Sequence, residues 1–157
     1  MTIAEAERRM QAVVGGLENE VMNNIVPKVE DVIVKQQQAR LMKGEYVSGS
    51  AIFPDYTAFT VSEKIRKNQD PDHVTLRDTG AFHDAIFVQA YGGLEDGIFE
   101  IDSSDSKRDK LIEKYEENDE WSGQGQIFGM NEENKTDIKE VSTPMLREYA
   151  SRITGFE

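Results

Sequence analysis

The sequence predicts an α+β fold, with a long N-terminal helix, a small antiparallel β-sheet built on a hairpin, and two or three C-terminal helices packed with it. Three observations predict it. Apolar residues recur at helical spacing near the N-terminus, two β-prone runs flank a glycine-bearing loop, and polar helical segments follow them. Because helices precede and follow the strands instead of alternating with them, an antiparallel sheet is favoured over a parallel one.

The chain has 157 residues, which fits a single domain that buries a real core. We divide it into an N-terminal helical arm, residues 1–43, and an α+β core, residues 44–157.

The N-terminal helix begins with a capping box, in which Thr2 is the cap and Glu5 follows three residues later. Apolar residues then recur at steps of three and four. They are Met10, Val13, Val14, Leu17, Val21, Ile25, Val29, Val32 and Ile33. This spacing predicts a helix over roughly residues 3–42. Pro27 removes a backbone hydrogen bond, so we expect a kink or break just before it.

An unbroken helix of this length would extend for about 60 Å, which suits a compact domain poorly. Two interpretations stay open. Part of the apolar stripe, around Val14, Leu17, Val21 and Ile25, packs on another chain, or the segment folds back on its own domain as two helices.

The middle of the chain begins with residues 44–61, which are rich in turn formers and β-formers and predict an extended connection. Ser62 can cap a short helix that runs to about Lys67. A turn follows at residues 68–72.

Two β-prone runs, residues 82–91 and 98–102, flank a loop at Gly92–Gly97 and predict a hairpin. Ser104 or Asp105 then caps a helix to about Glu117, with Leu111, Ile112 and Tyr115 on one side.

A polar loop follows, and then a short apolar segment, Ile127–Met130, which we call the apolar stop. A polar helix is expected from Asn131 to about Val141. Thr143 and Pro144 are a cap and a first-turn proline, so they predict a separate last helix to about Ile153.

Composition excludes several functions. The chain has no cysteine and two histidines, which excludes disulfides, thiolate zinc sites, cysteine nucleophiles and multi-histidine metal sites. The formal net charge of −12 argues against nucleic-acid binding by charge neutralisation and against adhesion to anionic membranes. The chain lacks an apolar N-terminal leader and an apolar stretch of about 18 residues, so we expect a protein made in a cytoplasm. We expect no cofactor and no metal.

The acidity is concentrated in residues 95–120, which carry 11 acids and four bases. Two interpretations stay open for this segment. It is a solvated helix end and loop, or it is an acidic surface that faces a molecule it must not bind.

Asp78-Thr79-Gly80 matches the signature of aspartic proteases, in which two such carboxylates share a proton across a dimer. The context argues against a protease, because Arg77 precedes the motif and a strongly helical segment, residues 105–117, follows it. The alternative is a turn just before a strand, in which Asp78 and Thr79 bond to nearby backbone and Gly80 supplies a positive φ. His83 is then a half-exposed strand residue, and it and Asp84 alternate across the strand. We expect no catalytic residue.

Residues 76–88, Leu-Arg-Asp-Thr-Gly-Ala-Phe-His-Asp-Ala-Ile-Phe-Val, also resemble another family. Virion-morphogenesis and neck proteins (tail-completion, head–tail joining) of tailed bacteriophages often carry a Leu-x-Asp-Thr-Gly-x-Leu/Phe-x-x-Ser-Ile-x-Val run. In that family a hairpin, a helix, a short apolar stop with glycine and a C-terminal helix follow. Residues 98–102, 107–111 and 127–131 are similar to the first three, so the resemblance covers about residues 74–155. Ala85 replaces the usual serine, and the acidic insert 116–126 is a second departure.

The resemblance implies a non-enzymatic structural protein that forms a homo-oligomeric ring at the head–tail junction of a phage. Its partners would be copies of itself, the neighbouring portal-side and tail proteins, and genomic DNA that passes through without sequence-specific binding. Its location would be the virion, assembled in the bacterial cytoplasm. An acidic segment could line the channel by like-charge repulsion. The alternatives are a tail terminator, a minor capsid component, or a homodimeric aspartic protease that uses Asp78-Thr79-Gly80.

Overall fold

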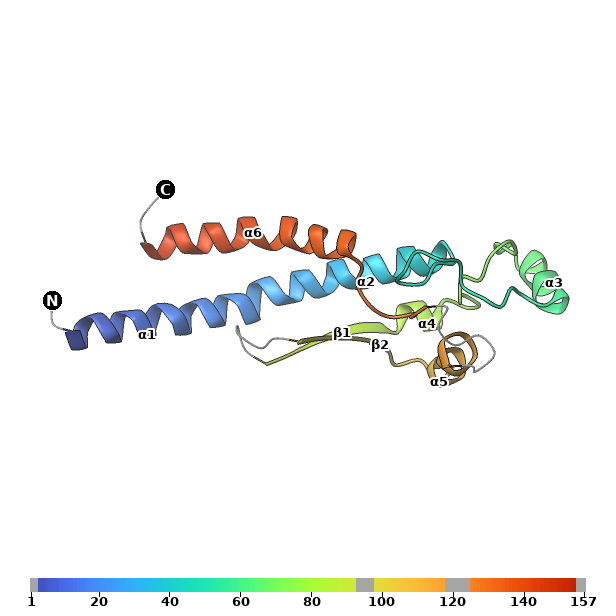
Figure 1. Ribbon diagram of the computed structural model, residues 1–157, viewed down its shortest axis with the longest axis horizontal. Coiled ribbons are helices and arrows are strands. Elements are labelled where there is room, and N and C mark those ends of the chain that lie inside the picture. The colour runs from blue at the N-terminus through green and yellow to red at the C-terminus, as the bar shows by residue number, and fades with distance from the viewer. Residues whose placement is uncertain (1–2, 93–97, 118–124, 155–157) are drawn as a thin grey trace.

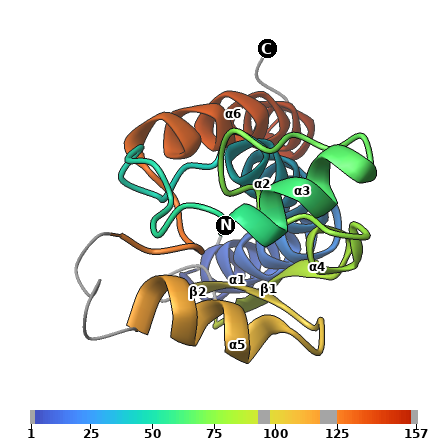
Figure 2. The same cartoon turned by 90° about the vertical axis from the view of Figure 1, so that its right-hand side faces the viewer.

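The computed structural model describes residues 3–92, 98–117 and 125–154. It is an α+β fold in which one long helical rod carries a two-stranded antiparallel sheet on one side and a C-terminal helix on the other (Figures 1 and 2). The predicted fold class is confirmed. The first and last parts of the molecule are helical, and the sheet lies between them in the chain.

The rod consists of α1 (Ile3–Glu20), a π-helical turn η1 (Val21–Ile25) and α2 (Val26–Met42). The predicted long helix is therefore confirmed, and it ends at Met42 as expected. Figure 1 shows that α2 continues along the direction of α1, so the interpretation that the segment folds back on its own domain as two helices is wrong.

Just before Pro27, where we expected a kink or break, the helix contains a π turn. The Val26 N–H donates to the Val21 carbonyl, five residues back. In an α-helix the ring of Pro27 would clash with the carbonyl of Asn23, four residues back. The wider π turn that contains Asn23 relieves this crowding, so the helix continues through the proline.

The buried positions that follow the π turn lie at steps of four: Ile25, Val29, Ile33, Gln37 and Leu41. In a regular α-helix each such step drifts by about 40° around the axis. The line of buried residues therefore winds around α2, so its first and last positions face different neighbours.

The hairpin consists of β1 (Ile86–Tyr91) and β2 (Ile98–Ser103), paired from Ile86 with Ser103 to Tyr91 with Ile98. It confirms the predicted hairpin. Its inner face contributes Val88, Phe99 and Ile101 to a cluster around Ile25, Val29 and Ile33 of the rod.

Helix α6 (Glu132–Thr154) covers the other side of the rod with Ile138 and Met145. Asn131 caps α6, because its side-chain oxygen accepts from the Asn134 N–H at 2.8 Å. Two helices were expected here, and that prediction is wrong, since Pro144 lies inside one continuous helix. Packing against the rod on both sides of Pro144 offsets the local cost of the proline, about 3 kcal/mol.

The second cluster lies at the C-terminal end of the rod and joins α2 to the core, residues 44–157. Its buried members are Leu41, Tyr46, Ile52, Val74, Leu76, Phe82, Ile86, Ile112, Tyr115 and Ile127. α5 (Arg108–Ile112) and the π turn η2 (Glu113–Glu117) contribute Ile112 and Tyr115, as predicted. The helix begins later than expected, and Asp105 accepts from the Lys107 N–H at 2.7 Å before it.

Three consecutive glutamines attach α2 to three different parts of the fold. Gln36 donates to Asp137 of α6 at 2.8 Å, Gln37 to the Gly129 carbonyl at 2.8 Å, and Gln38 to the His83 carbonyl at 2.9 Å. Successive helix residues point about 100° apart, so adjacent side chains reach separate neighbours.

Two further expectations are corrected. α3 (Ala58–Arg66) is capped by Thr57, whose hydroxyl accepts from the Thr60 N–H, and Ser62 lies inside the helix. The expected strand over residues 82–91 is shorter, because residues Ala81–Asp84 form a single helical turn, α4. His83 and Asp84 therefore follow one another around a helical turn and do not alternate across a strand.

The glycine pair in α1 allows a matched test of how α6 packs. A Cβ at Gly15 would meet nothing within 4 Å, whereas one at Gly16 would lie 2.6 Å from the Tyr149 hydroxyl oxygen. Gly15→Ala should raise the free energy of unfolding by about 0.5–1 kcal/mol through helix propensity. Gly16→Ala should gain less or lose stability, because Tyr149 must move. Urea unfolding of both variants measures this, and equal gains would contradict the packing of α6 at Gly16.

Candidate functional site

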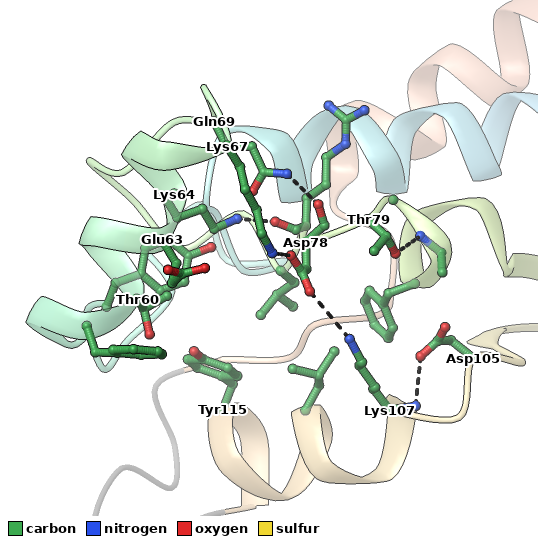
Figure 3. Close-up of a pocket in the computed structure, with 18 residues that line it drawn as sticks. Thr60, Glu63, Lys64, Lys67, Gln69, Asp78, Thr79, Asp105, Lys107 and Tyr115 are labelled. Carbon is green, nitrogen blue, oxygen red and sulfur yellow. Dashed lines mark hydrogen bonds and ion pairs between the residues drawn. The ribbon is translucent and has the colours of Figure 1, made fainter.

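A cavity of about 390 Å³ lies between α3, the 67–80 loop and the start of α5. Figure 3 shows Asp78 and Thr79 along its wall, and Gly80 also lines it. Apolar side chains from three parts of the chain also line it, among them Phe59, Leu76 and Leu111. The cavity therefore brings the Asp78-Thr79-Gly80 motif together with several charged side chains.

The Asp78 carboxylate lies between two lysines. One oxygen accepts from Lys67 at the end of α3, and the other lies 3.6 Å from the Nζ of Lys107, which precedes α5 (Figure 3). Gln69 donates to the backbone carbonyl of the same residue. Asp78 thus connects α3 to α5 across the cavity.

The rest of the motif shapes the backbone. Thr79 accepts from the Ala81 N–H at 3.3 Å, and Gly80 has a φ of +101° as the residue before α4. The sequence correctly predicted a turn with a bonded threonine and a positive φ at glycine. The turn leads into α4 and not directly into a strand, and the Asp78 side chain binds lysines where backbone contacts were expected.

Lys64 is the buried residue of α3. Its ammonium donates to the Arg77 carbonyl and lies 5.1 Å from the centre of the Tyr56 ring. A carbonyl dipole and the face of an aromatic ring both stabilise a cation. Sequence reasoning missed this role, because a lysine in a short helix is normally solvated.

The electrostatics at Asp78 suit an ion pair better than proton transfer. The hydrogen bond from Lys67 lowers the pKa of Asp78 below its ordinary value, and the nearby Lys107 charge acts in the same direction. An aspartic protease needs two carboxylates that share a proton. Here the groups that contact the Asp78 carboxylate are two ammonium groups, which favour its ionised form.

His83 is buried and its Nε2 lies 2.7 Å from the Thr75 carbonyl. Burial lowers the pKa of His83, and the hydrogen bond to Thr75 opposes this. The expectation of a half-exposed strand residue is wrong, because α4 turns the ring into the core.

The acidic segment is described over residues 98–117, and its remaining positions, including 118–120, lie outside the described residues. Some of its carboxylates hold the fold together. Asp102 pairs with Arg108 at 2.8 Å, and Glu116 accepts from the Ile127 N–H at 3.0 Å. Glu113 and Glu117 are exposed. Asp102 and Glu116 therefore have structural roles within the acidic segment.

Large apolar side chains are exposed at both ends of the elongated molecule. At one end, the first turns of α1 extend past both α6 and the hairpin in Figure 1, and Ile3, Val13 and Val14 are exposed on α1. At the other end, α3 stands away from the rod and exposes Phe59 and Ile65. Part of the predicted stripe is instead covered within the chain, since Ile25 is buried and Val21 packs beside it.

Within the described ranges, no group of three or more His, Asp and Glu side chains could hold a metal ion. The same part of the chain contains no helix with the length and apolar character of a membrane span.

Comparisons of the chain with protein-family models, with curated protein sequences and with solved structures found no match.

Asp78→Asn tests the structural role of the motif. The folded-state pKa of Asp78 is lowered, so its pairing stabilises the fold above the unfolded pKa, and this stability is lost as pH falls through the folded pKa. The variant should lose up to about 1 kcal/mol near neutral pH, the scale of exposed ion pairs. Its difference from the wild type should shrink below about pH 4. Urea unfolding of the wild type and the variant from neutral to acidic pH measures the loss of stability and its pH dependence. Acid peptidase activity that disappears in the variant would contradict the structural role.

Proposed function

We propose that the protein is a non-enzymatic structural component of a tailed phage, which assembles into a homo-oligomeric ring at the head–tail junction. The observation that carries this proposal is the exposed apolar surface at both ends of an elongated chain, on α1 and on α3. Apolar patches of this kind mark contact sites between proteins. A chain with a different patch at each end can contact two neighbours at once, as a ring requires.

The phage assignment rests on the resemblance of residues 74–155, and the arrangement of those residues supports it. The Asp78-Thr79-Gly80 turn, the hairpin, α5 and the Ile127–Met130 stop pack together against α2. Segments that resemble the family in sequence order thus also form one continuous unit. The ionised, lysine-paired Asp78 supports a role without catalysis.

The DNA channel is part of this proposal. Glu113 and Glu117 are exposed on η2, which follows α5 in the layer opposite α6 (Figure 2). If this layer faces the axis of the ring, the carboxylates repel the phosphates of passing DNA. Glu113→Gln with Glu117→Gln should then leave assembly intact and slow genome passage in infection assays. Loss of assembly would point to a docking surface, and unchanged infection to an outer loop.

Light scattering and electron microscopy of the purified protein test the ring. We expect a closed particle with a central opening, many times heavier than the 17.8 kDa chain. Labelled protein in phage particles should lie between capsid and tail. A label on the capsid away from this junction would favour a minor capsid component, and a label on isolated tails that lack a capsid would favour a tail terminator. A monomer at all accessible concentrations would overturn the proposal.

A further inference from the structure

We propose that copies of this chain join head to tail, with the exposed face of α1 in one copy covering α3 and the adjoining cavity in the next. The proposal rests on the homo-oligomeric assembly proposed above and names the two surfaces that make the contact. We call them the α1 stripe, which comprises Ile3, Val13 and Val14, and the α3 cap, which comprises Phe59 and the cavity that it lines.

Within the described residues, the α1 stripe is largely uncovered by its own chain. Its side chains are 81%, 44% and 57% exposed, in sequence order. At about 100° per residue, Ile3 and Val14 point in nearly the same direction from the helix axis, and Val13 lies beside them. α6 approaches α1 at Gly16, next to Tyr149, and its ion pair from Arg152 to Glu20 lies farther along the rod.

The α3 cap exposes a large aromatic side chain to solvent beside the cavity. Phe59 is 76% exposed, whereas Lys64 of the same helix is buried. A surface helix ordinarily turns its apolar side inward and its charges outward. Phe59 also lines the cavity of about 390 Å³, whose walls include Leu76, Phe82 and Leu111. The cap thus offers both an apolar surface and a hollow for a small aliphatic side chain such as that of valine.

Charge favours pairing between unlike ends. Over Ile3–Glu20, α1 carries four acids and two bases, and Glu7 and Glu18 are exposed close to the direction of Val14. α3 and the charged side chains that line the cavity carry five bases against three acids. The bases are Lys64, Arg66, Lys67, Arg77 and Lys107, and the acids are Glu63, Asp78 and Asp105. Pairing the stripe with the cap brings opposite charges together, whereas stripe-to-stripe or cap-to-cap pairing brings like charges together.

The position of the two surfaces then determines the kind of assembly. They lie at opposite ends of the long axis (Figure 1), so one copy cannot cover its own cap with its own stripe. Each copy contributes one stripe and one cap. A contact between different surfaces repeats from copy to copy and closes into a ring when the rotation permits.

Disulfide cross-linking tests this contact, and the natural chain is well suited to it because it contains no cysteine. Val14→Cys and Phe59→Cys are prepared separately, oxidised alone and as an equal mixture, and separated on non-reducing gels. Ile98→Cys at the hairpin is the matched control, since Ile98 is 65% exposed. We expect a covalent dimer in the mixture of Val14→Cys with Phe59→Cys, and monomer in each single variant and in the mixture of Val14→Cys with Ile98→Cys. The double variant Val14→Cys/Phe59→Cys should give a ladder of covalent oligomers.

The alternatives give different patterns. A dimer of Val14→Cys alone would show stripe-to-stripe pairing, and a dimer of Phe59→Cys alone would show cap-to-cap pairing; either overturns the proposal. Equal cross-linking with the Ile98→Cys control would show random collision and also overturns it. If light scattering finds an oligomer but the expected cross-link is missing, this contact is wrong and the ring survives. If light scattering finds only a monomer, both the proposed contact and the proposed ring are wrong.

Discussion

Replacing Arg40 by methionine is expected to lower the free energy of unfolding by about 2–4 kcal/mol. It removes the guanidinium donor from the Ile127 carbonyl and takes one donor each from the Gly129 carbonyl and the Gln37 side-chain oxygen. The Arg40 guanidinium is buried and donates to the carbonyls of Ile127 and Gly129 and to the side-chain oxygen of Gln37. These bonds hold the Ile127–Met130 stop against α2. Burial lowers the pKa of Arg40 to about 10, so the group still carries its charge at neutral pH.

The matched control is Arg66→Met, since Arg66 is exposed and pairs with Glu63 at 2.7 Å on the same helix. Its loss should cost much less than the loss of Arg40, because exposed ion pairs contribute little to stability. Arg40→Lys should recover only part of the wild-type stability, because a single ammonium cannot reproduce the planar set of donors. Urea unfolding of the three variants measures these differences. Equal losses at Arg40 and Arg66 would contradict the anchoring role of Arg40.

Arg40 illustrates what could not be predicted from the sequence. The apolar periodicity predicted the rod, and the β-prone runs around Gly92–Gly97 predicted the hairpin, because both signals are local. Arg40 and Gln37 look like solvated helix positions in sequence. Their burial depends on a segment some 90 residues away that packs onto α2. Contacts between residues so far apart in the chain produce no periodic pattern in the sequence from which they could be predicted.

Two helix boundaries were predicted wrongly because local sequence patterns do not determine them. Pro144 is a helix starter by local rules, but packing on both sides holds α6 continuous through it. Thr57 and Ser62 are both acceptable caps for a short helix, and the local pattern gives no basis for choosing Thr57.

At the candidate site, the turn at Asp78-Thr79-Gly80 could be predicted because its chemistry is local. The two lysines that bind Asp78 could not. Lys67 and Lys107 reach it from elements separated by 40 residues. The cavity beside the motif likewise exists only once α3 and α5 are in place.

Truncation of Tyr46 should have the largest effect of any single change considered for this protein. Its side chain is fully buried, and its hydroxyl lies 2.6 Å from the Tyr115 carbonyl and 3.0 Å from the Phe53 carbonyl. It therefore links the loop after α2 to η2. The ring also packs directly on Gly125, where an added Cβ would lie 2.6 Å from the Tyr46 Cγ. Removal of this side chain opens a cavity and breaks the link between three segments at once.

Tyr46→Ala is expected to lower the free energy of unfolding by about 3–5 kcal/mol, the range for loss of a large buried aromatic side chain. Tyr46→Phe keeps the packing and removes the hydroxyl, so it should cost about 1–3 kcal/mol for the buried carbonyl left unpaired. Tyr91→Ala is the control: Tyr91 is 45% exposed on β1, and its loss should cost below about 1 kcal/mol. Urea unfolding gives all three values. If Tyr46→Phe costs as much as Tyr46→Ala, the hydrogen bond dominates and the packing role assigned to the ring is wrong. If it costs nothing, the ring acts by packing alone.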